Sequence, residues 1–99
     1  MSNIIGQLSE QSFCYQGSIE KYIESYGKPT DWEETEEYQG WTLRIIAPNQ
    51  GILGIDIFHP EHGGFSADTH EKFGYYDSEP HFQFAKQAIS NLGKINATT

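Results

Sequence analysis

Basic residues are scarce in this chain. Its 99 residues include six Lys and Arg against fourteen Asp and Glu, which gives a net charge of −8. Such an excess of negative charge repels the phosphates of nucleic acids and the head groups of anionic lipids. Long hydrophobic runs are also missing, since no apolar stretch approaches the ~20 residues of a membrane-spanning helix. We therefore expect no direct nucleic-acid binding and no membrane association.

Cysteine occurs once, at Cys14, so the chain cannot form an internal disulfide. This agrees with a reducing compartment, and the segment Met1–Glu10 lacks the basic region and the long apolar stretch of a secretion signal. We therefore predict a cytoplasmic location. Because Cys14 lies between Phe13 and Tyr15, we expect its thiol to be a small buried apolar group rather than a nucleophile.

The motifs of common enzyme classes are absent as well. The sequence contains no Gly-x-Ser-x-Gly turn, no phosphate-binding or dinucleotide-binding glycine loop, no His-Glu-x-x-His helix and no pair of cysteines. A hydrolase with paired carboxylates needs two acids that converge in a cleft, whereas the acids here are concentrated in one run along the chain. The sequence predicts a non-enzymatic protein with no catalytic residues and no bound cofactor.

The composition is nevertheless that of a folded protein. Apolar residues make up 36% of the chain and aromatic residues 14%, which is enough to build a packed core. A chain of this length organises one core rather than two. We predict a single domain over residues 1–99, with mobile termini at 1–12 and 94–99.

Two segments have the apolar spacing of amphipathic helices, 19–26 and 80–92. Ser18 precedes the first as its N-cap, and Gly27 with Pro29 is expected to end it. The second has Ser78 as its cap and Pro80 in its first turn, and it is expected to end at Gly93. The apolar stripes consist of Ile19, Tyr22, Ile23 and Tyr26 in the first, and of Phe82, Phe84, Ala85, Ala88, Ile89 and Leu92 in the second.

Along the stretch 41–58, apolar side chains recur at every second position, which is typical of two strands, and residues 48–51 are expected to form the turn between them. We predict a hairpin in which the numbers of facing residues sum to 100. Leu43 then faces Ile57 on the apolar side, and Arg44 faces Asp56 on the outer side. A slip of one residue would place Leu43 opposite Asp56 and mix the two faces, so the pattern favours the first register.

These elements predict an α+β fold. We expect a small antiparallel sheet of three or four strands, built on the 41–58 hairpin, with 65–68 and 73–76 as candidates for the remaining strands. The helices over about 19–26 and 80–92 are expected to pack on one face of this sheet. The apolar face that they would cover consists of Trp41, Leu43, Ile45, Leu53, Ile55 and Ile57.

The most unusual local feature is the segment 31–38, which contains five carboxylates and two large aromatic side chains, with four of the carboxylates between the two aromatics. One interpretation is a solubilising loop or an edge strand whose charges prevent unwanted pairing. The other is an interaction surface with aromatic anchors, in which the carboxylates attract a basic protein partner. The predicted interaction residues are Trp32, Glu33, Glu34, Glu36, Glu37 and Tyr38.

We therefore predict a small acidic protein-interaction or regulatory domain, such as an inhibitor, an antitoxin-like protein or an adaptor. Its partner would be a protein with a basic surface, including a DNA-binding protein whose site the acids would occupy. A homodimer is a further expectation, because the first or last strand of a sheet leaves an edge open for pairing.

Histidines offer an alternative function. His59 and His62 are three residues apart, and Asp68 or His70 is placed to complete a metal site, which would make the chain a metal-binding protein or a metal-dependent enzyme. The competing interpretation is that these histidines are ordinary loop residues, since no established metal motif is present. A second alternative is a small-ligand binder whose pocket is lined by Tyr75, Tyr76, His70 and His81.

Overall fold

A computed structural model of the chain describes residues 4–26, 34–47 and 51–98. The strands are β1 (Cys14–Gly17), β2 (Thr35–Tyr38), β3 (Trp41–Ile46), β4 (Gly54–His59) and β5 (Gly63–Ala67), and the helices are α1 (Ile4–Ser9), α2 (Ile19–Tyr26), α3 (His70–Phe73) and α4 (Glu79–Thr98). All strand pairs are antiparallel, in the order β1-β5-β4-β3-β2. The fold is α+β with an antiparallel sheet, as predicted, and the sheet has five strands within the described residues, where three or four were predicted.

The central hairpin has the predicted register. Leu43 faces Ile57 and Arg44 faces Asp56, so the alternation of apolar residues set the pairing of β3 with β4. A second hairpin joins β2 to β3 through Gln39, with φ of 50°, and Gly40, with φ of 86°. Two consecutive residues with positive φ match the twist of the flanking strands in a two-residue turn. These hairpins place β2 at one edge of the sheet and leave β1 at the other.

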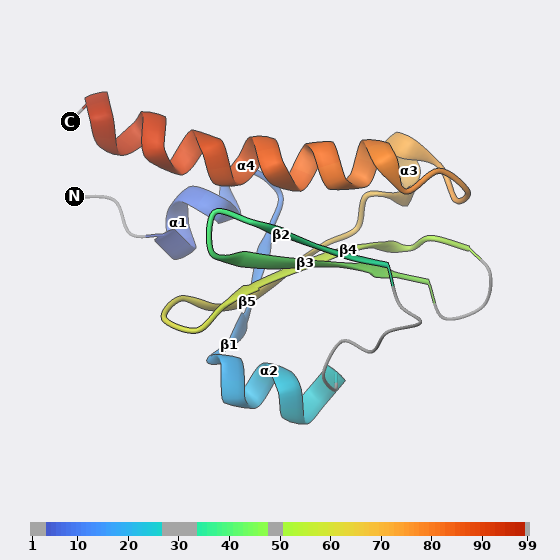
Figure 1. The fold of residues 1–99 in the computed structure, drawn as a ribbon, viewed down its shortest axis with the longest axis horizontal. Coiled ribbons are helices and arrows are strands. Elements are labelled where there is room, and N and C mark those ends of the chain that lie inside the picture. The colour runs from blue at the N-terminus through green and yellow to red at the C-terminus, as the bar shows by residue number, and fades with distance from the viewer. Residues whose placement is uncertain (1–3, 27–33, 48–50, 99) are drawn as a thin grey trace.

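The core lies between the sheet and α4, which runs along one face across β3 and β4 (Figure 1). Leu8 of α1 and Phe13, just before β1, extend it. In a domain of this size each large core side chain matters, because truncation of one typically costs about 2–5 kcal/mol. The core consists of Leu8, Phe13, Trp41, Leu43, Ile45, Ile52, Ile55, Ile57, Phe65, Ala67, Phe82, Ala85, Ala88, Ile89 and Leu92.

Helix α2 has the predicted bounds, but it does not lie on the face of the sheet that α4 covers. Its N-cap is confirmed, since the Ser18 hydroxyl accepts a hydrogen bond from the N–H of Lys21 at 3.4 Å. The helix contacts β1 and β5, and Figure 1 shows it on the side of the sheet away from α4. The prediction that both helices cover one face is therefore not confirmed. Gly27 and Pro29, expected to end α2, lie outside the described residues.

The segment 73–76, predicted as a strand, instead begins with the last residue of the short helix α3. Gly74 ends α3 with φ of 86°, and its N–H donates to the carbonyl of His70 at 2.8 Å. This left-handed residue turns the chain out of the helix and away from an extended course.

The predicted apolar face also needs a correction, because Leu53 is 43% exposed while the neighbouring Ile52 is buried.

Helix α4 continues past its predicted end to Thr98, because a single glycine such as Gly93 weakens a helix without stopping it. At its start, the carbonyl of Ser78 accepts the N–H of Phe82 at 3.1 Å, which places Ser78 at the predicted N-cap position, and the carboxylate of Asp77 accepts the N–H of Glu79 at 3.1 Å. None of the helices in the described part of the chain combines the length and the apolar character needed to cross a membrane.

Candidate functional site

The acidic segment is partly folded into the edge strand β2. Trp32 and Glu33 lie outside the described residues. Glu36 forms an ion pair with Lys86 of α4 at 2.5 Å, and this hydrogen bond raises the pKa of the Lys86 ammonium. Glu37 accepts a hydrogen bond from the hydroxyl of Thr42 at 2.7 Å. The carboxylates of Glu36 and Glu37 therefore have partners within the molecule.

Tyr38, the predicted aromatic anchor, also faces inward. Its ring packs against the core, and its hydroxyl shares a hydrogen bond of 2.7 Å with the hydroxyl of Ser90. The ammonium of Lys86 lies 5.9 Å from the centroid of the ring. Tyr38 and Glu36 together fasten the edge strand to α4. In this structure Tyr38 holds the fold together and does not stand out as an exposed anchor.

Glu34 contacts a different part of the molecule. The hydroxyl of Ser78 donates to the carboxylate of Glu34 at 3.3 Å, which connects the start of β2 to the loop between α3 and α4. This loop carries Tyr75 and Tyr76. The contact thus brings an exposed carboxylate of the predicted acidic segment against a loop that carries two tyrosines distant in sequence.

Three exposed apolar side chains lie on neighbouring segments here, and we call them the tyrosine patch: Leu53, Tyr75 and Tyr76. Tyr76 is 90% exposed, and Tyr75 and Leu53 are each almost half exposed. The two tyrosine rings meet edge to face with centroids 6.4 Å apart. The chain around Leu53 and Tyr75 is fixed, because Ile52 donates its N–H to the carbonyl of Tyr75 at 2.8 Å. The patch is therefore an exposed surface on an anchored backbone.

His70 joins the two halves of the tyrosine patch. Its ring stacks on Tyr75 with centroids 5.6 Å apart, and its Nδ1 atom is 2.8 Å from the carbonyl oxygen of Leu53. Because a carbonyl only accepts, Nδ1 carries the hydrogen. The imidazole thus holds Tyr75 beside Leu53.

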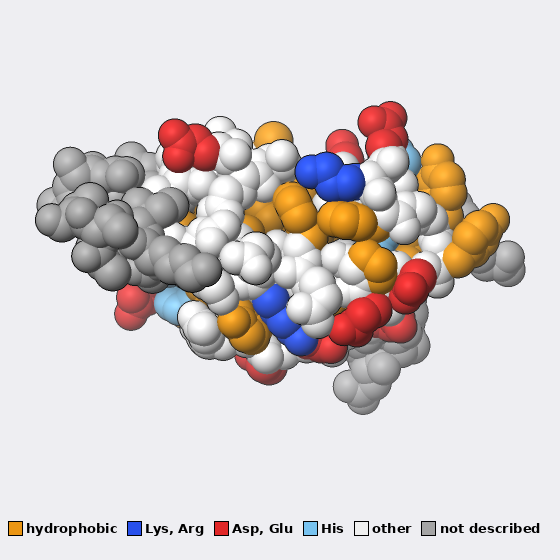
Figure 2. Space-filling view, turned by 90° about the horizontal axis from the view of Figure 1, so that it is seen from above, with side chains coloured by type: hydrophobic (Ala, Val, Ile, Leu, Met, Phe, Trp, Pro, Cys, Tyr) orange, Lys and Arg blue, Asp and Glu red, His pale blue; other side chains and the backbone are white. Residues whose placement is uncertain are grey.

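Carboxylates surround the tyrosine patch. Glu34, Asp77 and Glu79 are all exposed and lie on or against the loop that carries the tyrosines. Figure 2 shows hydrophobic side chains at the right-hand end of the molecule, where Figure 1 places α3, with Asp and Glu side chains on both sides of them. The neighbouring helix α3 adds Glu71 and Lys72, whose charges offset each other. The surroundings of the patch therefore carry net negative charge.

His59 and His62 meet at the other end of β4. Their ring centroids are 4.5 Å apart, and the ring of His62 stacks on the buried Trp41 at 5.6 Å. Burial lowers the pKa of His62, the adjacent His59 lowers it further, and Glu61 acts in the opposite direction. Nδ1 of His59 accepts the N–H of Glu61 at 3.0 Å, so the hydrogen of a neutral His59 ring is on Nε2.

The other predicted metal ligands are elsewhere. His70 bonds to Leu53, at the opposite end of β4 from His59, and six residues of strand span about 20 Å. Asp68 is exposed just before α3. Among the residues that the structure describes, no group of three or more His, Cys, Asp or Glu is arranged to hold a metal ion. The structure brings His59 and His62 together but not the full predicted set.

His81, the fourth histidine, is completely buried. Its Nε2 atom lies 3.1 Å from the carbonyl oxygen of Gly74, and its Nδ1 atom contacts the hydroxyl of Thr69. These bonds fix the end of α3 against α4. The small-ligand alternative placed His81 in one pocket with Tyr76, but the ring of Tyr76 is almost fully exposed and does not line an enclosed cavity.

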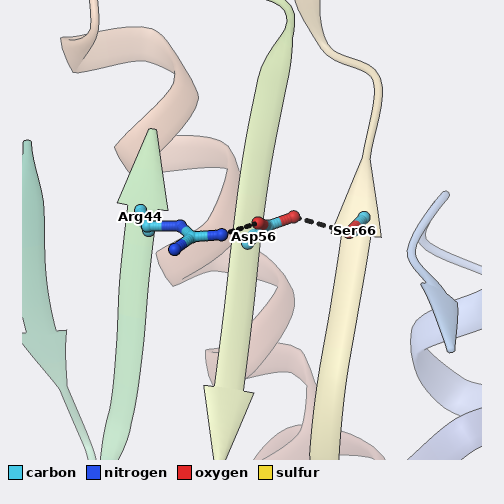
Figure 3. Close-up of polar contacts among 3 residues, drawn as sticks. All are labelled: Arg44, Asp56 and Ser66. Atoms are coloured by element: carbon cyan, nitrogen blue, oxygen red, sulfur yellow. Dashed lines mark hydrogen bonds and ion pairs between the residues drawn. The ribbon is translucent and has the colours of Figure 1, made fainter. Parts of the chain in front are cut away.

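A buried ion pair lies on the face of the sheet away from α4. Arg44 donates to Asp56 at 3.1 Å, and Ser66 donates to the same carboxylate at 2.5 Å (Figure 3). Periodicity predicted that Arg44 faces Asp56 but not that both would be buried.

Cys14, which pairs with Ser66 in the sheet, is exposed, so its predicted burial is wrong. An edge strand has no neighbour on its open side to cover such a residue.

The sequence singled out Tyr75 and Tyr76 only as the lining of a small-ligand pocket, and their exposure on the surface was missed because 73–76 was assigned to a strand. Gly74 and the pair Asp77 and Ser78 were the available signals, since all three residues are typical of turns. What the patch offers is apolar contact and negative charge.

Comparison of the chain with models of protein families, with curated proteins and with solved structures gives no match.

Proposed function

We propose that this chain is a small acidic, non-enzymatic interaction domain that binds a protein partner with a basic surface through the tyrosine patch. An inhibitor, an antitoxin-like regulator or an adaptor would work in this way, and we place it in the cytoplasm. The observation that carries the proposal is the exposure of Tyr76, Tyr75 and Leu53 beside the carboxylates of Glu34, Asp77 and Glu79.

Tyrosine is well suited to anchor such a contact. A Tyr side chain buries a large apolar area, loses few rotamers on binding, and keeps a hydroxyl that can hydrogen-bond to the partner. Exposed apolar clusters with a polar rim commonly mark interaction sites on soluble domains. Tyr75 is held by His70, so part of the surface is ordered before a partner arrives.

The charges of the chain favour a basic partner. With a net charge of −8, the molecule attracts cationic proteins over distances of about a Debye length, ~10 Å at 0.1 M salt. The carboxylates beside the patch then align the partner as the rings make contact. The partner therefore needs Lys or Arg next to an apolar hollow that accepts tyrosine rings.

Selection from a random peptide library displayed on phage, with the intact chain immobilised, tests the proposal. We expect the enriched peptides to combine Lys or Arg with apolar residues. Binding of these peptides should be lost in the double variant Tyr75→Ser, Tyr76→Ser. It should weaken, and become less sensitive to salt, in the triple variant Glu34→Gln, Asp77→Asn, Glu79→Gln.

A matched variant separates local charge from overall charge. Glu10, Glu20 and Glu24 are exposed and lie far from the tyrosine patch in sequence. Their replacement by Gln removes the same three charges, and we expect the selected peptides to bind this variant almost as tightly as the original chain. Equal loss of binding in both triple variants, or enrichment of peptides without basic residues, would contradict the proposal.

A further inference from the structure

Three aromatic rings follow one another beside the carboxylates of the tyrosine patch. Tyr75 is the middle member, since its ring stacks on His70 with centroids 5.6 Å apart and meets the ring of Tyr76 at 6.4 Å. The planes of the two tyrosine rings are inclined by 67°, so these rings do not cover each other face to face. Tyr76 is almost fully exposed and Tyr75 almost half exposed. The patch therefore presents open ring faces to a partner.

The patch is small, so the ordering of a bound segment must cost little free energy. Fixing the backbone of one flexible residue costs about 1–2 kcal/mol, and full burial of one large apolar side chain returns only about 1.5–3 kcal/mol. A proline-rich segment is already extended before it binds, because each proline holds its φ at about −65°. Such a segment suits a site with three exposed apolar side chains better than a flexible one.

The spacing of the rings agrees with a bound polyproline II helix. This helix rises about 3.1 Å per residue, so the two prolines of a Pro-x-Pro segment are separated by roughly 6 Å along its axis. The successive centroids of His70, Tyr75 and Tyr76 are 5.6 and 6.4 Å apart. The two prolines can therefore lie against neighbouring rings, and they border an apolar hollow into which a tyrosine ring fits.

Other forms of peptide recognition fit these observations less well. An amphipathic helix binds through apolar anchors over about two turns, whereas the exposed apolar surface here consists of Leu53, Tyr75 and Tyr76. Strand addition uses the backbone of a sheet edge, and the edge strand β2 carries Glu36 and Glu37, whose charges discourage pairing. A proline-rich segment uses the ring faces themselves, as it does in several families of peptide-binding domains.

We infer that the basic partner presents a proline-rich segment with a Pro-x-Pro core and with Lys or Arg beside it. The prolines lie against Tyr75 and Tyr76, and the basic side chains reach the carboxylates of Asp77 and Glu79. Both carboxylates are exposed, and each keeps oxygen lone pairs beyond the single hydrogen bond that it accepts from an N–H of Glu79 or of Gln83. This inference specifies the partner in the proposed function and rests on that proposal.

Two peptide libraries displayed on phage, selected on the intact immobilised chain, test the inference. One library has Pro-x-Pro at its centre, the other has Ala-x-Ala, and the flanking positions are random in both. We expect binders mainly from the first library. Replacement of both prolines of a selected peptide by Ala keeps its charge and should raise the dissociation constant about tenfold, because the segment must then become ordered on binding.

Two variants at Tyr76 separate the aromatic ring from its apolar bulk. Tyr76→Phe keeps the ring faces and should bind a selected peptide within about twofold of the unchanged chain, whereas Tyr76→Leu should weaken binding about tenfold. Neither should shift the urea midpoint of unfolding, because the side chain is almost fully exposed. In NMR spectra of the complex, the ring protons of the peptide prolines should move upfield, since they lie over tyrosine faces.

The outcomes distinguish this inference from the proposed function. Equal affinity for the proline and alanine peptides, with binding that still needs Tyr75 and Tyr76 and weakens with salt, would overturn the inference and leave the basic partner in place. Absence of binders from both libraries would overturn both. Equal weakening by Tyr76→Phe and Tyr76→Leu, or proline protons that do not shift in the complex, would contradict contact between prolines and ring faces.

Discussion

Arg44 and Asp56 form an ion pair of 3.1 Å across β3 and β4, and 7% or less of either side chain is exposed. The two residues face each other in the register of the hairpin, and Ser66 on the next strand donates to the same carboxylate. A slip by one residue would separate the charges, so the pair adds specificity to a register that the apolar residues already favour.

Loss of the Asp56 carboxylate should be strongly destabilising. We expect Asp56→Asn to lower the free energy of unfolding by about 3–5 kcal/mol, because removal of one member of a buried ion pair takes away the charge that compensates the other. Urea unfolding at neutral pH measures this. Glu37→Gln, which changes an exposed carboxylate, should shift the free energy by about 0.5 kcal/mol or less. Similar losses in the two variants would contradict the expectation.

The buried imidazole of His81 makes a second prediction. Thr69→Val keeps the shape of the side chain but removes the hydroxyl that contacts Nδ1 of His81. A buried polar atom without a partner typically costs about 1–3 kcal/mol, and we expect that loss in the free energy of unfolding. Thr42→Val removes a hydroxyl that bonds at the surface and serves as the control. A stability of Thr69→Val equal to that of the unchanged chain would refute the role of this bond.

Stability should depend on pH through His62. Burial and the neighbouring His59 lower the pKa of His62 below its ordinary value of 6.5, so the unfolded chain binds this proton more readily than the folded chain. The stabilising contribution is therefore complete above pH 6.5 and is lost as the pH falls below that value. Urea midpoints measured between about pH 8 and pH 5 should decrease toward acid.

The variant His62→Gln identifies the group responsible. It removes the imidazole that stacks on Trp41, and we expect a shallower decrease of the urea midpoint toward acid than in the unchanged chain. The NMR titration of His62 should give a midpoint below 6.5. Identical pH profiles for the two proteins would assign the acid sensitivity to another group.

The hydroxyls of Tyr38 and Ser90 should act together. Tyr38→Phe and Ser90→Ala each break the hydrogen bond of 2.7 Å that holds β2 on α4, and each should cost about 0.5–1.5 kcal/mol. Because both variants remove the same bond, their effects should not add in the double variant. Additive losses in urea unfolding would show that the two hydroxyls stabilise the fold independently.

Sequence patterns predicted the elements whose side chains alternate clearly or whose ends are marked. The β3–β4 register follows from the apolar alternation, and α2 begins after the cap that Ser18 provides. Both are local signals that act within a few residues. The edge strands carry no such signal: β1 has four residues and an irregular pairing with β5, and β2 contains the two acids Glu36 and Glu37, which are uncommon in strands.

The candidate site was harder to predict than the fold because contacts between distant segments create it. Glu34 comes to the tyrosine loop through Ser78, which is 44 positions away in sequence, and Leu53 reaches Tyr75 through His70. Nor does composition show which aromatic side chains are exposed. Tyr38 looked like an anchor next to its acids but is held by α4, whereas Tyr76 is free of the core.

The most direct measurement is an NMR map of binding, made with the isotope-labelled chain and a Lys- and Arg-rich peptide from the display selection. The largest amide shifts are expected around Leu53, Tyr75, Tyr76 and Asp77, and they should disappear in Tyr75→Ser, Tyr76→Ser. Shifts centred on Tyr15, Trp41 and His62 at the other end of the sheet, or no shifts at saturating peptide, would contradict docking at the tyrosine patch.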